Sequence, residues 1–150
     1  MTESDRLRIV RRFDVPPRSV FDAFTDPDAM RVWWTPDTAF DLDVRVGGRW
    51  RITRRDGDET LVMEGTYLEV EAPTRLRFTI AMPQVSETAD EISLTVEPDG
   101  SGCVATFEQT GDGIADELRA LPAGATSASE AGWQQGFDLM EGAWRARSQR

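Results

Sequence analysis

The chain is 150 residues long, carries a formal net charge of −10, and contains 17 arginines but no histidine, lysine or asparagine. Without His and Lys, the sequence excludes Ser-His and Cys-His nucleophile pairs, imidazole metal sites and lysine Schiff bases. An acidic chain of this length predicts one domain over residues 1–150 that binds neither nucleic acid nor a membrane surface.

Two short helices are expected after a first strand. Alternating apolar residues predict this strand over residues 7–13, and the following VPP sequence ends it. Pro17 suits the first position of a helix, and the apolar spacing after it predicts a helix over residues 17–25. Asp26 and Pro27 repeat this start signal and predict a second short helix that runs to Trp33.

The middle of the chain changes to a period of two, which is typical of strands with one buried face. Turns that contain Gly or Pro separate the alternating stretches at hairpin spacing, and Gly65 is interpreted as a bulge within one stretch. Strands are expected at residues 40–44, 49–53, 61–70, 76–82, 92–96 and 103–110. Consecutive hairpins of this kind form an antiparallel meander.

A helical period returns near the end of the chain. Large apolar residues spaced four, three and four apart, from Trp133 to Trp144, predict a long helix with one apolar face. Gly136 inside this helix costs about 0.5–1 kcal/mol relative to Ala, so its missing side chain either allows close packing or leaves room for a guest. Ile114, Leu118 and Leu121 predict a shorter helix before it.

This order of elements predicts an α+β fold, because an antiparallel sheet with one apolar face and a long helix with one apolar stripe must bury those surfaces against each other. We expect the sheet to curve around the C-terminal helix. Where a curved sheet and a helix diverge, their apolar surfaces leave a cavity, and this cavity is the expected ligand site.

Several segments also occur in an order that is typical of one known family. They are VPP at 15–17, VFDAFTDP at 20–27, WWTP at 33–36, VGGRW at 46–50, EGTYLEVEAP at 64–73, RLRFT at 75–79 and GW at 132–133. The chain therefore resembles the START-like helix-grip superfamily and, within it, the family similar to the C-terminal domain of the activator of Hsp90 ATPase. The resemblance implies a helix-grip fold, with about six to seven strands and two short helices after the first strand. It leaves the activity open, because superfamily members bind lipids, hormones or polyketides, catalyse cyclisation or dehydration, or only bind partners.

The first functional hypothesis is a module that binds a small hydrophobic or aromatic molecule between the sheet and the last helix. The residues expected to line its cavity are Trp33, Trp34, Trp50, Ile52, Glu64, Thr66, Leu68, Phe78, Ile80, Leu94, Phe107, Trp133, Phe137 and Met140. Trp33 and Trp34 would form the mouth of the cavity or plug it. The alternative is that these side chains only fill one another's space as core, since burying a large side chain already stabilises a fold by roughly 1.5–3 kcal/mol.

The second hypothesis is an enzyme of the polyketide cyclase or hydrolase kind that the superfamily includes, with inward carboxylate or hydroxyl groups as its catalytic groups. Glu64 is the candidate catalytic residue, because it alternates with Leu68, and an inward carboxylate beside apolar groups would act as a general acid or base. The alternative is that Glu64 pairs with an arginine such as Arg51 on the next strand, or lies in solvent past a bulge at Gly65. Tyr67 has the opposite parity and is expected to face outward, and Cys103 lacks a neighbouring base that would make it a nucleophile.

A third hypothesis is a co-chaperone-like regulator of an Hsp90-type ATPase, which rests on the family resemblance. We expect no cofactor and no metal site, because the aspartate pairs fall short of a calcium ligand set. The sequence leaves open whether the chain forms a homodimer and whether it binds a chaperone. The single cysteine and the absence of a signal-peptide pattern predict a cytoplasmic location.

Overall fold

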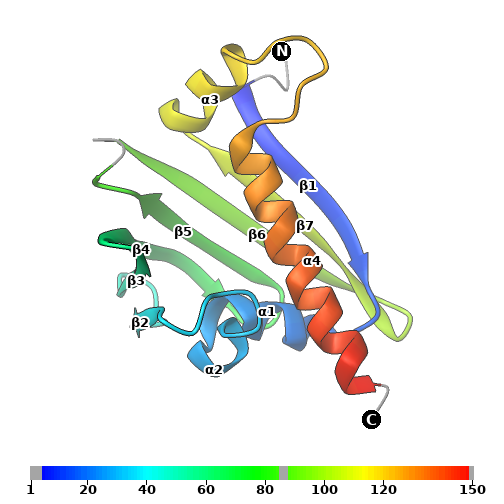
Figure 1. Ribbon diagram of the computed structural model, residues 1–150. Helices are drawn as coiled ribbons and strands as arrows, with labels where there is room; N and C mark the ends of the chain where they lie inside the picture. The colour runs from blue at the N-terminus through cyan, green and yellow to red at the C-terminus, as the bar shows by residue number, and fades with distance from the viewer. Residues whose placement is uncertain (1–4, 85–87, 149–150) are drawn as a thin grey trace.

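The computed structural model describes residues 5–84 and 88–148. Within these residues the chain forms one antiparallel sheet of seven strands, in the order β1-β7-β6-β5-β4-β3-β2, and four helices (Figure 1). The strands are β1 (Arg6–Phe13), β2 (Ala39–Leu42), β3 (Arg49–Asp56), β4 (Glu59–Glu71), β5 (Arg75–Ala81), β6 (Ala89–Asp99) and β7 (Gly102–Thr110). The helices are α1 (Pro17–Thr25), α2 (Pro27–Met30), α3 (Asp112–Arg119) and α4 (Ala128–Ser148). The predicted α+β helix-grip architecture is confirmed.

The segment between β1 and β2 follows the predicted start signals, but its second helix is short. Pro17 occupies the first turn of α1, and Asp26 caps α2 by accepting a hydrogen bond from the backbone N–H of Asp28 at 3.0 Å. The second helix ends at Met30 and not at the predicted Trp33. Residues 31–34 continue as tight turns, because the N–H of Trp33 donates to the carbonyl of Met30 only three residues earlier.

A bulge in β4 changes which side chains face the helix layer. The register of β4 against β5 shifts between Tyr67 and Glu69, so β4 carries one extra residue at Leu68. The predicted bulge at Gly65 is therefore wrong, because the bulge of β4 lies at Leu68. Because the extra residue inverts the alternation, Tyr67 points inward and is 3% exposed, whereas Leu68 is 37% exposed. Both orientations are the reverse of the sequence prediction, which rests on an alternation of side chains that continues unbroken from Glu64 to Val70.

Gly65 instead marks a gap in the ladder between β4 and β5. The indole of Trp50 enters this gap, and its Nε1 donates to the carbonyl of Thr79 at 3.0 Å. The N–H of Thr66 donates to the Thr79 hydroxyl at 2.9 Å. A Cβ at Gly65 would overlap the Thr79 carbonyl and lie 2.7 Å from the Trp50 nitrogen. The glycine therefore lets Trp50 bond to the sheet backbone, which fixes its ring on the inner face.

The long helix α4 crosses the inner face of the sheet on the side of β1 and β7, while β2 to β5 extend beyond it (Figure 1). Its predicted apolar stripe is confirmed, because Phe137 and Met140 are each 1% exposed and Trp133 and Trp144 pack against the core. The sheet and helix therefore share a core at one side and separate toward β2. None of the described helices is long and apolar enough to cross a bilayer.

Arg11 on β1 connects α4 to the sheet through its guanidinium group. Its guanidinium donates to Asp138 at 2.9 Å and to Glu141 at 3.0 Å, both on α4. The same guanidinium lies 5.3 Å from the ring centroid of Phe13 and 5.8 Å from that of Phe137. Ion pairs and cation–ring contacts of one side chain therefore connect α4 to the edge strand β1.

Candidate ligand-binding pocket

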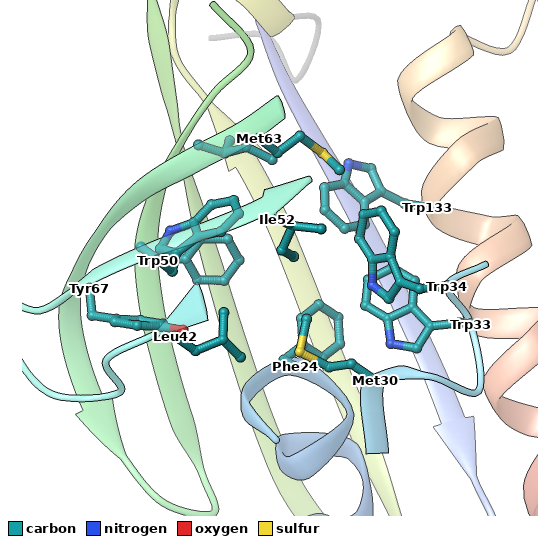
Figure 2. A pocket seen from close by; sticks show the side chains of 12 residues that line it. Phe24, Met30, Trp33, Trp34, Leu42, Trp50, Ile52, Met63, Tyr67 and Trp133 are labelled. Atoms are coloured by element: carbon teal, nitrogen blue, oxygen red, sulfur yellow. The ribbon is translucent and has the colours of Figure 1, made fainter. Parts of the chain in front are cut away.

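An apolar pocket lies where β2 to β5 separate from α4 (Figure 2). Its walls come from these strands, from α1 and α2, from the segment after α2, and from α4. The twelve lining residues are Phe24, Met30, Trp33, Trp34, Leu42, Trp50, Ile52, Met63, Tyr67, Phe78, Ile80 and Trp133. All twelve are apolar or aromatic, so none of them carries a carboxylate or a cationic group.

The pocket is nearly filled by its own side chains. The space that water-sized molecules can occupy is about 30 Å³, and holding a water molecule requires at least roughly 10–15 Å³ on this measure. A water molecule therefore fits, but an aromatic guest fits only after a lining side chain moves. The structure contains the apolar lining that the sequence predicts, but the expected open hollow is largely closed.

The predicted ligand-binding residues fall into three groups. Seven of them line the pocket: Trp33, Trp34, Trp50, Ile52, Phe78, Ile80 and Trp133. Four others are at most 1% exposed and lie within the solid core, as the alternative interpretation expected: Leu94, Phe107, Phe137 and Met140. The remaining three lie away from this pocket, and their expected inward placement is corrected: Glu64, Thr66 and Leu68. The bulge at Leu68 explains where these three side chains lie, because it inverts the predicted alternation of β4.

Five lining residues are missed by the sequence reasoning: Phe24, Met30, Leu42, Met63 and Tyr67. Phe24 and Leu42 carry a visible signal, because each lies on the apolar face of a predicted element. Met63 lies opposite Ile52 in the pairing of β3 with β4. This neighbour depends on strand register, which hydrophobic alternation alone does not specify.

Trp33 is fixed from two sides. Its Nε1 donates to the carbonyl of Ala23 at 2.8 Å, and its ring lies against α4 where a Cβ at Gly136 would come within 2.8 Å of Cε3. The missing side chain at Gly136 therefore serves close packing, one of the two interpretations that the sequence left open. The Trp33 and Trp34 ring centroids are 5.1 Å apart, and the two rings together form one wall of the pocket (Figure 2).

Trp133 is fixed by a buried polar chain. Its Nε1 donates to the side-chain oxygen of Gln109 at 2.9 Å, and the Gln109 amide nitrogen donates to Asp90 at 2.9 Å. The Asp90 carboxylate also accepts the backbone N–H groups of Gly113 and Ile114 at the start of α3. This chain fixes the orientation of the Trp133 ring from behind, because each partner is itself held by a further hydrogen bond.

Tyr67 contributes the hydroxyl group of the lining. Burial raises the pKa of Tyr67 above its ordinary value, and the negative charge of Asp43 raises it further. Tyr67 therefore stays a neutral phenol at physiological pH. With no other ionisable group in the lining, the pocket wall is uncharged and suits an uncharged molecule.

Glu64 occupies the position that the alternative interpretation assigned to it. Its carboxylate lies 3.6 Å from Arg51 Nε, and its side chain is 45% exposed. It is therefore not placed to transfer a proton to a guest in the apolar pocket. Cys103 is fully buried, and this burial raises the pKa of its thiol against the opposing effect of Arg12. Such a thiol is not activated as a nucleophile.

A curved antiparallel sheet that holds a C-terminal helix, with an apolar pocket between them, defines a helix-grip protein of the START-like class. The family described as "Activator of Hsp90 ATPase homolog 1-like protein" matches residues 14–144, and the chain belongs to this family. No curated protein matches the chain.

Solved structures share this fold at low sequence identity. A Rhodobacter sphaeroides protein is 17% identical with a TM-score of 0.78, and the match covers 95% of this chain and 94% of that protein. A Nitrosomonas europaea protein is 18% identical with a TM-score of 0.75, over 98% of both chains. A Chromobacterium violaceum protein is 24% identical with a TM-score of 0.70, over 92% of this chain and 96% of that one. At these identities the likeness establishes the fold alone.

Proposed function

We propose that the chain binds a small hydrophobic or aromatic molecule in the apolar pocket. One observation carries the proposal: twelve apolar or aromatic side chains from strands, helices and the α2–β2 segment converge on a common space, and none of them is charged. A concave apolar site between a sheet and a helix is a typical small-molecule site. Membership of a START-like family supports the same role, because folds of this class commonly bind hydrophobic ligands.

Entry of a ligand requires side-chain movement, and the two methionines of the lining provide it. An apolar cavity of about 150 Å³ holds benzene, so the present space of about 30 Å³ must grow several-fold. Methionine is unbranched and adapts its shape at little cost. Met63 is partly buried and extends across the pocket toward Trp133 (Figure 2). Turning Met63 toward solvent opens the pocket, while Trp33, Trp50 and Trp133 keep their hydrogen bonds.

A fluorescence titration with the apolar probe N-phenyl-1-naphthylamine tests the proposal. The wild-type chain is expected to bind the probe saturably. Met63→Trp puts a rigid ring in place of the adaptable side chain and should weaken binding about tenfold or more, since overpacking costs roughly 1–3 kcal/mol. The matched control is Leu68→Trp, which adds the same ring to the same strand at an exposed position and should leave binding unchanged. No saturable binding by the wild type, or equal losses in both variants, would contradict the proposal.

A second candidate function follows from the family description, which names an activator of the Hsp90 ATPase. We retain regulation of an Hsp90-type ATPase as this candidate. The test is the ATP hydrolysis rate of a bacterial Hsp90 with and without a saturating amount of the chain. Stimulation supports the candidate, and an unchanged rate rejects it.

A further inference from the structure

The wall of the pocket contains a buried donor without a partner. Among the buried nitrogens and oxygens of the side chains that the structure describes, Trp34 Nε1 is the atom that makes no hydrogen bond. The other three indoles of the lining donate to groups of the chain: Trp33 to Ala23, Trp50 to Thr79, and Trp133 to Gln109. The unpaired N–H is therefore a specific property of Trp34 and not a general consequence of burying tryptophan here.

Ring contacts, and not the indole nitrogen, hold Trp34 in place. Its ring centroid lies 5.1 Å from that of Trp33 and 6.2 Å from that of Phe40, the latter in an edge-to-face arrangement. Figure 2 shows the Trp34 ring in the pocket wall, across from Trp50. A buried N–H without an acceptor destabilises a fold relative to a bonded one, and native proteins contain few such groups. Trp34 is thus a lining residue whose N–H the described part of the chain leaves without an acceptor.

We propose that Trp34 Nε1 donates a hydrogen bond to the ligand, and that the ligand is an uncharged, largely hydrocarbon molecule with an acceptor oxygen, such as a ketone, an ester or an ether. This inference deepens the proposed binding function and rests on it. An anionic ligand does not fit, because the twelve lining residues offer no cation to offset the burial of its charge. A carbonyl or ether oxygen satisfies the indole N–H and brings no further donor that the pocket would have to satisfy.

Tyr67 carries the hydroxyl group of the lining, so its contribution as a donor must be distinguished from that of Trp34. Its phenol lies at the opposite side of the pocket, near Leu42 (Figure 2). The Tyr67 oxygen is not among the fully enclosed atoms that lack a partner, whereas Trp34 Nε1 is. Trp34 is therefore the group that gains most from a ligand acceptor.

Matched pairs of probes test this inference. In acetophenone and α-methylstyrene, a carbonyl oxygen replaces a methylene group of nearly the same shape; 2-acetylnaphthalene and 2-isopropenylnaphthalene form a larger pair. The ketone-to-alkene affinity ratio is measured for the wild type and for Trp34→Phe, Tyr67→Phe and Trp133→Phe. We expect the ratio to fall about five- to tenfold in Trp34→Phe, because one neutral hydrogen bond is lost. The ratio should stay at the wild-type value in the other two variants, even though their absolute affinities change.

The indole proton resonances of the wild-type chain give a second readout that needs no variant to fold. The ketone should move the Trp34 indole proton downfield, and the alkene should not. Equal binding of ketone and alkene by the wild type, with no difference at Trp34, would overturn the inference and leave the proposed binding function intact. A loss of the ratio in Tyr67→Phe instead of Trp34→Phe would also overturn it. If neither member of either pair binds, the proposed function fails, and this inference fails with it.

Discussion

The contact between α4 and Trp33 makes a stability prediction that three glycines of one helix can test. Gly132, Gly136 and Gly142 all lie inside α4, but their surroundings differ. A Cβ at Gly132 or Gly142 meets nothing within 4 Å, whereas a Cβ at Gly136 lies 2.8 Å from Trp33 Cε3 and 3.1 Å from Cζ3. The same substitution by alanine should therefore have opposite effects along the helix.

The magnitudes follow from two terms. Replacing Gly by Ala in a helix interior stabilises it by about 0.8–1 kcal/mol, and this is the whole effect expected for Gly132→Ala and Gly142→Ala. In Gly136→Ala the same gain is opposed by overpacking against Trp33, which costs about 1–3 kcal/mol. Trp33 cannot move aside freely, because its indole is bonded to Ala23. We expect Gly136→Ala to be about 1–3 kcal/mol less stable than Gly132→Ala.

Guanidinium chloride unfolding, followed by far-ultraviolet circular dichroism, measures these differences as shifts in midpoint at constant slope. Tryptophan fluorescence of the folded state adds a local readout, since only the Gly136 variant displaces an indole. If Gly136→Ala gains as much stability as Gly132→Ala, the reasoning is refuted, and Trp33 does not pack against α4 at this point.

Two further predictions concern a buried phenol and a helix contact. The unfolded chain ionises Tyr67 near its ordinary pKa of 10.0, whereas the folded chain keeps it protonated to higher pH, so stability should fall above pH 10 by up to about 1.4 kcal/mol per pH unit. Tyr67→Phe should lack this part of the fall, and identical pH profiles would reject the prediction. Arg11→Met should lower the free energy of unfolding by about 1–2 kcal/mol, because it removes the ion pairs with Asp138 and Glu141 and the cation contacts with two rings. This loss should shrink in 1 M NaCl, and a loss that is independent of salt would contradict the ionic part of the argument.

The element order could be predicted because it depends on local signals. Proline at the starts of α1 and α2, the Asp-Gly and Gly-Gly turns, and the stripe of α4 each act within a few residues. The limits of the prediction lie where a tertiary contact decides the backbone. Hydrophobic alternation cannot show that β4 holds an extra residue at Leu68. A bulge accepts polar and apolar side chains alike, so the residue types do not mark its position.

Less of the pocket than of the fold could be predicted, for the same reason. The residues placed correctly, such as Trp50, Ile52 and Trp133, lie on elements whose inward face is unambiguous. Core and lining look alike in sequence, because both need large apolar side chains. What separates Phe137 in the solid core from Trp133 at the pocket is the point along α4 at which the sheet diverges, and this point depends on contacts between distant segments.

The hydrogen bonds of the pocket divide its lining into a fixed part and an adaptable part. Trp33, Trp50 and Trp133 each donate to another group of the chain, so moving them would break a partly buried hydrogen bond. Met30 and Met63 carry no such restraint and can change rotamer within the apolar lining. The pocket should therefore enlarge toward its methionines while these three tryptophan rings stay in place. A ligand bound in this way would place its hydrocarbon part against the methionines and its oxygen at Trp34 Nε1, the donor that the other three indoles do not supply.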